Sequence, residues 1–240
     1  QKFMKRIIYV VLAVALMASC TAKITPEGPK GSVSFSISED NSLLSKAVLP
    51  CPDDFIVGTI NSSTASVAAL SGTYGTLKDK VITIATGDYI TSAYNKTKEE
   101  ALAGNAGRGE KRIFGESESY SVREAQVTAV SIKCEVVNSS VNIIFRESFT
   151  DAIDNGRVTV WNAESRKISF STANEGEAFF DPEDGQTVTL LITGTRKSDN
   201  VPVSQITNIS ICARTAYSIN LGVNSSSAPI NITVDDAMLD

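Results

Sequence analysis

The sequence of 240 residues contains no histidine and is short of aromatic residues and of basic charge. Without histidine the chain has no Ser-His-Asp or Cys-His catalytic groups, no zincin motif and no histidine-ligated metal site. Acidic residues outnumber basic ones by 27 to 22, so the net charge of -5 indicates no basic surface for nucleic acid. We therefore predict no catalytic residue, no metal site, no cofactor and no nucleic-acid partner.

Cysteine is also scarce, with four residues in the chain. If Cys20 is modified, as argued below, an odd number remains, which does not describe a disulfide framework. Cys134 shares its strand parity with Ile132 and Val136, so we expect a buried thiol. A disulfide between Cys134 and Cys212 is the alternative that the sequence leaves open.

The first apolar run is too short to span a bilayer. Ile7–Ala18 has twelve residues, whereas a spanning helix needs about 20. The basic residues Lys5 and Arg6 precede this run, and small residues follow it. A basic start, a short apolar stretch and small residues form a secretory signal, so we predict that residues 1–19 are a signal peptide.

The end of this segment, Leu16–Cys20, resembles the lipobox of bacterial lipoproteins. In such proteins the signal is cut before the cysteine, and the cysteine thiol is acylated. Each buried methylene adds about 0.8 kcal/mol, so two or three acyl chains give lasting attachment to a membrane. We predict lipid attachment at Cys20 and a location at the outer membrane or cell surface. An ordinary signal peptide with a chance cysteine is the alternative.

Most of the remaining chain has the alternation of β-strands. Residues 20–30 are polar with two prolines, as in a tether. Val33, Phe35 and Ile37 then alternate with serine, which predicts a half-buried strand. Further strands are expected near 82–84, 89–93, 130–136, 141–145, 158–161, 168–170, 188–192, 209–213, 217–223 and 230–234. We predict an all-β fold of antiparallel sandwiches with less than about 15% helix.

Few segments favour a helix. Thr97–Ala103 could form two turns ended by Gly104, and Phe149–Ile153 could form one turn. Val137–Ser140 is a plausible hairpin turn between the strands on either side of it. The terminal strand, Ile230–Val234, is expected to pair within its own sheet, with donation to a neighbouring molecule as the alternative.

A weak internal repeat divides the chain into two parts. Short motifs near 132–143 recur near 211–232 with different spacing. This favours two tandem sandwiches, 31–135 and 136–240, of transthyretin-like or immunoglobulin-like type. A single elongated sandwich is the alternative.

Four other features have a simple structural interpretation and a functional alternative. Asp181–Gly185 is expected to be an acidic turn, with calcium binding as the alternative. Gly104–Lys111 is expected to be a mobile surface loop rather than a phosphate loop. Glu116 and Glu118 are expected to be solvated rather than a glycosidase pair. Trp161 has the parity of an outward-facing ring, which could stack on a sugar.

The order of these elements resembles fimbrillin-like lipoproteins of the Bacteroidetes, a group with domains of unknown function. The resemblance rests on the lipobox, Gly31–Ile37, Gly87–Tyr89, Val130–Cys134 and Ile230–Asp236. It implies two β-sandwich domains of transthyretin-like topology and a role in building or capping surface pili. It transfers one functional residue, Cys20 as the acylated position, and no catalytic residue.

One departure from that family bears on assembly. Its pilus subunits are cut after an arginine, which frees a groove for the next subunit's strand. From Thr21 through Gly107 this chain has no arginine, and a cut after Arg108 would remove several strands. The sequence therefore favours a permanently anchored structural or adhesive protein with a protein or glycan partner at the cell surface. The alternative is a glycan-binding accessory lipoprotein of an outer-membrane nutrient importer.

Overall fold

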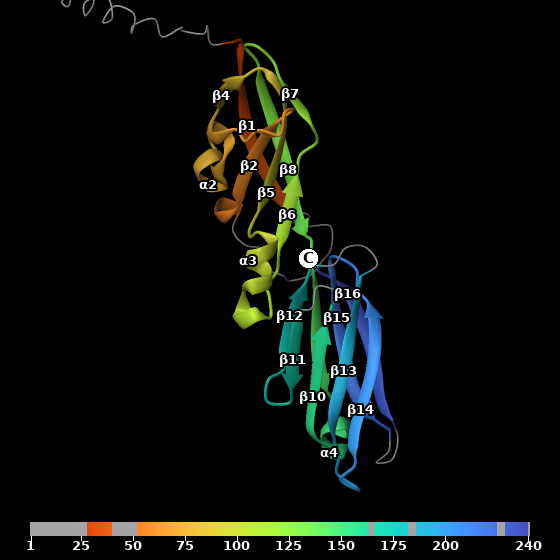
Figure 1. The fold of residues 1–240 in the computed structure, drawn as a ribbon. Helices are drawn as coiled ribbons and strands as arrows, with labels where there is room; N and C mark the ends of the chain where they lie inside the picture. Colours follow the sequence, from red (N-terminus) through yellow and green to blue (C-terminus); the bar gives the residue numbers. More distant parts are fainter. Residues whose placement is uncertain (1–27, 40–51, 163–165, 182–185, 225–228, 240) are drawn as a thin grey trace, which may run out of the picture.

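A computed structural model describes residues 28–39, 52–162, 166–181, 186–224 and 229–239 (Figure 1). Among these residues 59% lie in strands and 13% in helices. The predicted all-β fold is thus confirmed, with a helix content below the expected limit. The predicted signal peptide, Cys20 and most of the tether lie outside the described residues.

The N-terminal half forms one sheet that bends around its own core. Its strands are β1 (Lys30–Glu39), β2 (Ile56–Asn61), β3 (Gly72–Thr73), β4 (Ile82–Ala85), β5 (Gly87–Tyr94), β6 (Ile113–Glu116), β7 (Tyr120–Val122) and β8 (Val127–Val136). Their order is β3-β2-β5-β6-β8-β1-β4, and β7 pairs with β5. Alternate side chains of β1 and β8 point inward, and Val33, Ile132 and Ile113 are fully buried.

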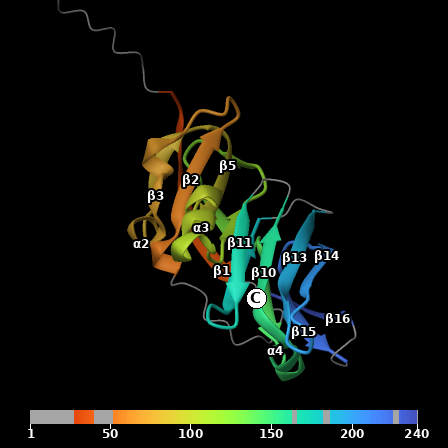
Figure 2. The ribbon, with the colours of Figure 1, turned by 60° about the horizontal axis from the view of Figure 1, so that its bottom comes forward.

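The C-terminal half is a sandwich of two four-stranded sheets. Its strands are β9 (Ser139–Phe145), β10 (Ile153–Trp161), β11 (Lys167–Ser171), β12 (Gly176–Phe180), β13 (Thr187–Arg196), β14 (Pro202–Ser210), β15 (Thr215–Val223) and β16 (Ile230–Met238). One sheet has the order β11-β10-β13-β14 and the other β12-β9-β15-β16. Figure 2 shows β10, β11, β13 and β14 as one layer with β15 and β16 behind it. Leu190, Ile192, Phe170, Phe180 and Ile219 fill the space between the layers.

The helices are short and lie at the ends of strands. They are α2 (Tyr74–Leu77), α3 (Lys98–Ala103) and α4 (Glu147–Ala152), with single 3-10 turns at Pro52–Asp54, Ala68–Leu70 and Asn105–Gly107. Helix α3 begins at a capping box: the Thr97 hydroxyl accepts from the Glu100 N–H at 3.2 Å, and the Glu100 carboxylate accepts from the Thr97 N–H at 2.8 Å. The predicted helix ended by Gly104 is confirmed.

Each half contains one parallel strand pair, so the sheets are mixed rather than purely antiparallel. Strand β1 runs parallel to β8, and β9 runs parallel to β15. The predicted hairpin at Val137–Ser140 is wrong, because β8 and β9 belong to different sheets. Asn138 is buried, and its side chain accepts from the Arg112 N–H at 3.0 Å and donates to the Glu110 carbonyl at 2.8 Å. These bonds fix the connection between the halves instead of a hairpin turn.

Two arginines join the halves on the side of α3. Arg108 donates to the carbonyls of Asn174 and Glu175 at 2.8 and 2.7 Å, and its guanidinium lies 4.8 Å from the centroid of the Phe170 ring. Arg166 reaches back to the Leu102 and Gly107 carbonyls at 3.1 and 2.5 Å. We call these contacts the arginine junction.

Residues 104–111 therefore do not form the mobile surface loop that the sequence predicted. Gly109 has a φ of +83°, and a Cβ there would lie 3.0 Å from the Phe179 carbonyl. The Arg108 carbonyl accepts from the Phe179 N–H at 2.8 Å. Gly109 allows close approach of the two halves, since a side chain there would push β12 away.

The last described residues also contact the N-terminal half. Strand β16 pairs with β15 along its whole length, from Ile230 to Met238. The Leu239 N–H then donates to the Arg214 carbonyl at 2.6 Å, and Leu239 packs against the core of the N-terminal half. The prediction that the terminal strand pairs within its own sheet is confirmed.

Candidate functional site

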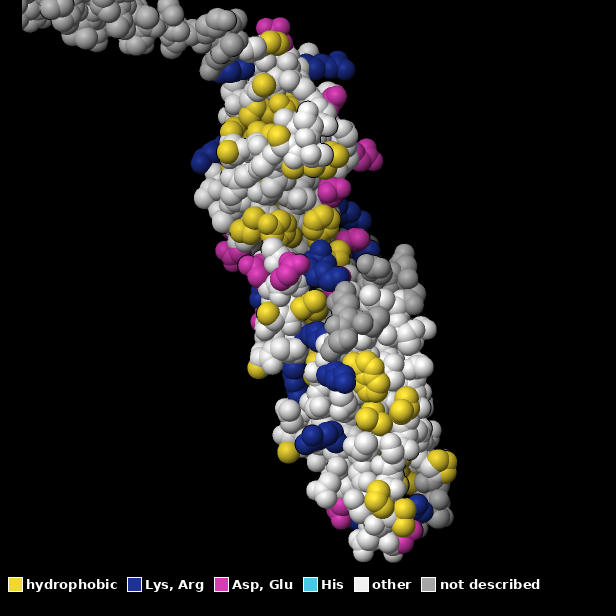
Figure 3. All heavy atoms as spheres, viewed as in Figure 1, with side chains coloured by type: hydrophobic (Ala, Val, Ile, Leu, Met, Phe, Trp, Pro, Cys, Tyr) yellow, Lys and Arg dark blue, Asp and Glu magenta, His cyan; other side chains and the backbone are white. Residues whose placement is uncertain are grey.

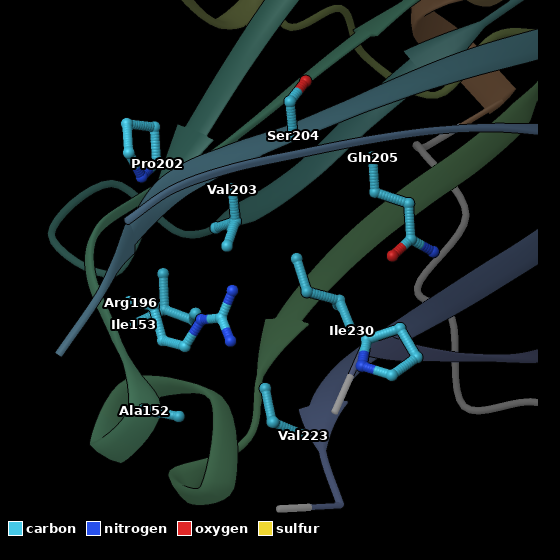
Figure 4. A pocket seen from close by; sticks show the side chains of 10 residues that line it. Ala152, Ile153, Arg196, Pro202, Val203, Ser204, Gln205, Val223 and Ile230 are labelled. Atoms are coloured by element: carbon cyan, nitrogen blue, oxygen red, sulfur yellow. The ribbon is translucent and has the colours of Figure 1, made fainter. Parts of the chain in front are cut away.

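A concavity opens at the end of the C-terminal half that points away from the N-terminal half in Figure 1. It is a groove of about 300 Å³ between the edge strands β14 and β16, beside α4. Its apolar walls come from four elements: Ile153 begins β10, Val203 lies on β14, Val223 ends β15 and Ile230 begins β16 (Figure 4). We call this the distal groove.

The distal groove exists because two sheets end together there. Strands β14 and β16 are both the last strands of their sheets, so no further strand closes the sandwich between them among the described residues. Val203 and Ile230 turn their side chains toward the gap, in keeping with the period-two pattern of both strands.

One cation, Arg196, lies among the residues that line the groove. Figure 4 shows the Arg196 side chain extending into the groove, and its Nε atom lies 3.5 Å from a carboxylate oxygen of Asp199. Ser204 and Gln205 add polar atoms at the rim. Apolar and polar atoms therefore contribute to the lining in similar measure. Among the described residues no group of three or more histidine, cysteine or acidic residues could hold a metal ion.

The predicted acidic features do not come together into a site. Glu116 ends β6 and Glu118 follows it; both residues are exposed, as the sequence predicted. The carboxylate of Asp181 is paired with the Arg112 guanidinium across the two halves. Residues 182–185, the rest of the predicted acidic turn, lie outside the described residues.

Trp161 ends β10 and is partly exposed, as its parity predicted. The Lys167 ammonium lies 6.0 Å from the centroid of its ring, because the two residues are paired across β10 and β11. Within the described part of the chain, Trp161 makes no ring contact with another aromatic side chain. One ring beside a lysine is a weaker platform for a sugar than two or three coplanar rings.

The two described cysteines are free thiols. Cys134 is buried and Cys212 is exposed, so the disulfide alternative is not realised. Burial raises the pKa of the Cys134 thiol to about 11. At neutral pH this thiol is protonated, and a protonated thiol is a poor nucleophile.

No helix among the described residues is long and apolar enough to cross a membrane.

A family model described as a domain of unknown function (DUF4493) matches residues 30–240. The chain belongs to the DUF4493 family. No curated protein matches it.

Several solved structures resemble this DUF4493 chain at low identity. The fimbrial anchor protein Mfa2 from Porphyromonas gingivalis is 10% identical, with a TM-score of 0.49 over 87% of this chain and 98% of that one. A candidate cell adhesion protein from Bacteroides eggerthii is 12% identical, with a TM-score of 0.49 over 89% and 96%. A candidate polysaccharide binding protein from Bacteroides thetaiotaomicron is 11% identical, with a TM-score of 0.49 over 88% and 98%.

Sequence reasoning missed the distal groove of this DUF4493 chain. The residues that line it are separated by up to about 78 positions, and none of them belongs to a recognisable motif. Pro202 begins β14, and proline is tolerated at the first position of any strand as well as on edge strands, so it does not identify the edge.

Proposed function

We propose that the chain is a lipid-anchored protein of the cell envelope with a structural or adhesive role at the cell surface. The observation that carries this proposal is the placement of its ends. Strand β1 begins at one pole of an elongated body, and the distal groove opens at the other pole (Figure 1). An anchor at Cys20 would hold the first pole near the outer membrane. The distal groove would then face outward, where a protein or glycan partner is met.

We further propose that residues 31–135 and 136–240 are two β-sandwich domains of one rod. Each half has its own cluster of buried apolar side chains, which supports this division. The arginine junction and the packing of Leu239 oppose bending between the halves. A stiff body suits a protein that carries load or presents a surface away from the membrane.

The pairing of β16 and the contacts of Arg108 support a permanently anchored protein over a subunit that polymerises after cleavage. Strand β16 is fully paired with β15, and the bonds of Leu239 hold its end in place. Arg108 is the first arginine after the predicted signal, and its side chain is bound to Asn174 and Glu175. A cut there would remove β1 to β5 together and break the junction.

The test is Cys20→Ala, expressed in a bacterium that processes lipoproteins. We expect the wild-type protein in the membrane fraction with an acylated N-terminal peptide by mass spectrometry. The variant should lose at least about 90% of its membrane association, because the acyl chains supply nearly all of the binding. Cys212→Ala is the matched control and should remain with the membrane. Retention of Cys20→Ala in the membrane fraction would contradict the proposal.

A further inference from the structure

The edge strands of the described sheets differ in how well they are protected. Native edges are usually short or carry charges, which prevents pairing with another chain. Strands β3, β4, β11 and β12 have at most five residues. Strand β16 has nine residues but carries Asp235 and Asp236. Strand β14 also has nine residues and carries no charge, so it is the least protected of these edges.

Charge is absent well beyond the strand itself, because no residue from Val201 through Ala213 is charged. The outer face of β14 also presents Ile206, which is 65% exposed, the highest value among the large hydrophobic side chains of the described residues. In Figure 3 the right-hand side of the C-terminal half carries no charged side chain at mid-height. An exposed isoleucine on a long uncharged edge is unusual unless another strand covers it.

The hydrogen-bond register shows which backbone groups of β14 face outward. At one end the Arg196 N–H donates to the Val201 carbonyl, and at the other the Ile211 N–H donates to the Gln186 carbonyl, both at 2.9 Å. Odd-numbered residues of β14 therefore bond to β13, since bonded pairs alternate along an antiparallel ladder. The N–H and C=O groups of Ser204, Ile206, Asn208 and Ser210 point away from the sheet.

The outward N–H and C=O groups of β14 can pair with the same groups of a second copy. If two copies meet antiparallel with Ile206 opposite Ile206, both isoleucines exchange backbone bonds and lie on one face. Ser204 then pairs with Asn208 of the other copy. Pro202, which has no N–H, falls at the strand end opposite Ser210, where only one bond per pair is lost.

We propose that β14 is a homodimerisation edge, at which a second copy of this chain pairs antiparallel about a two-fold axis at Ile206. The two β11-β10-β13-β14 sheets then form one continuous sheet. The net charge of -5 makes two copies repel each other, so a stable contact between them needs an uncharged surface. Strand β14 is the long edge that provides one, whereas pairing of β16 edges would bring Asp235 and Asp236 of both copies together.

Disulfide trapping tests the register directly. In the proposed dimer the two Cα atoms at position 206 lie about 5.5 Å apart, within the range of about 4.4–6.8 Å that a disulfide spans. Ile206→Cys is made in the full chain with Cys212→Ser, purified in detergent and oxidised mildly. We expect a disulfide-linked dimer to form at least about tenfold faster than for Val127→Cys in the same background, because only position 206 is held opposite its own copy. Val127 is 62% exposed but lies in the N-terminal half.

Sedimentation of the unoxidised protein is the second measurement. The full chain should form dimers in a concentration-dependent way. Ile206→Lys places two like charges opposite each other and should weaken association at least about tenfold, whereas Val127→Lys should leave it unchanged. A chain that is monomeric at all concentrations, or an Ile206→Cys variant that cross-links no faster than the Val127→Cys variant, overturns the proposal. Either result would leave the β14 edge to a strand from a different protein.

Discussion

A chain that ends at Ser227 should lose the stability of its C-terminal half. This truncation removes β16, which pairs with β15 along all nine of its residues. Ile230 is buried and Ile232 packs against the same cluster, so their loss costs about 2–5 kcal/mol in apolar burial alone. It also exposes the backbone of β15 and removes Leu239 from the junction. Because whole domains are stable by only about 5–15 kcal/mol, we expect a melting transition lowered by more than about 10 °C.

Most of the free energy of unfolding that is lost with β16 comes from residues at the start of this strand. Ile230, Ile232 and Val234 share one face of the strand, but Val234 is 38% exposed. Val234→Ala is therefore the matched control and should change the free energy of unfolding by less than about 0.5 kcal/mol. Thermal melts followed by circular dichroism measure both variants. A truncated chain that melts like the full one would show that β16 is dispensable for its own sandwich.

Replacing both Arg108 and Arg166 by alanine should uncouple the two halves. Each guanidinium bonds to backbone carbonyls of the opposite half, and hydrogen bonds to charged groups contribute about 1.5–3 kcal/mol each. The double variant also loses the stacking of Arg108 on Phe170. We expect both halves to stay folded while the angle between them varies.

Small-angle scattering and limited proteolysis measure this change. The double variant should have a larger radius of gyration and become at least about tenfold more sensitive to cleavage near residues 104–111, because cleavage follows the population of the open state. Arg157→Ala, which removes an exposed arginine of β10, is the matched control. An unchanged scattering profile would mean that the hydrogen bonds of Asn138 and the packing of Leu239 hold the two halves together without the two arginines.

Local features of the fold could be predicted from the sequence. Alternation of Val33, Phe35 and Ile37 with serine identified β1, and the same period identified most later strands. Thr97, Glu100 and Gly104 marked the ends of α3, because capping depends on residues within a few positions of each other. The segment of β2, Ile56–Asn61, was missed, since its glycine, threonine and asparagine weaken the apolar pattern.

Long-range contacts could not be predicted. Strands β1 and β8 pair in parallel although about 95 residues separate them, and alternation alone does not name a partner. The Gly104–Lys111 segment has the composition of a mobile loop. Its order comes from Asn174 and Glu175, which lie about 66 residues later in the chain. The distal groove could not be predicted either, because its walls come from residues that are distant in sequence and meet only when both sheets have formed.

Labelling of intact cells tests most directly whether this protein stands at the cell surface on a lipid anchor. Val81, which is 61% exposed, is replaced by cysteine in a chain with Cys51→Ser and Cys212→Ser. A membrane-impermeant maleimide is then added at neutral pH. Buried Cys134, whose pKa is raised to about 11, serves as the internal control and should stay unlabelled.

We expect that the Val81→Cys variant is labelled on intact cells to the same extent as after lysis, and that adding Cys20→Ala abolishes this cell-associated signal. Labelling that requires the envelope to be opened first would contradict this expectation.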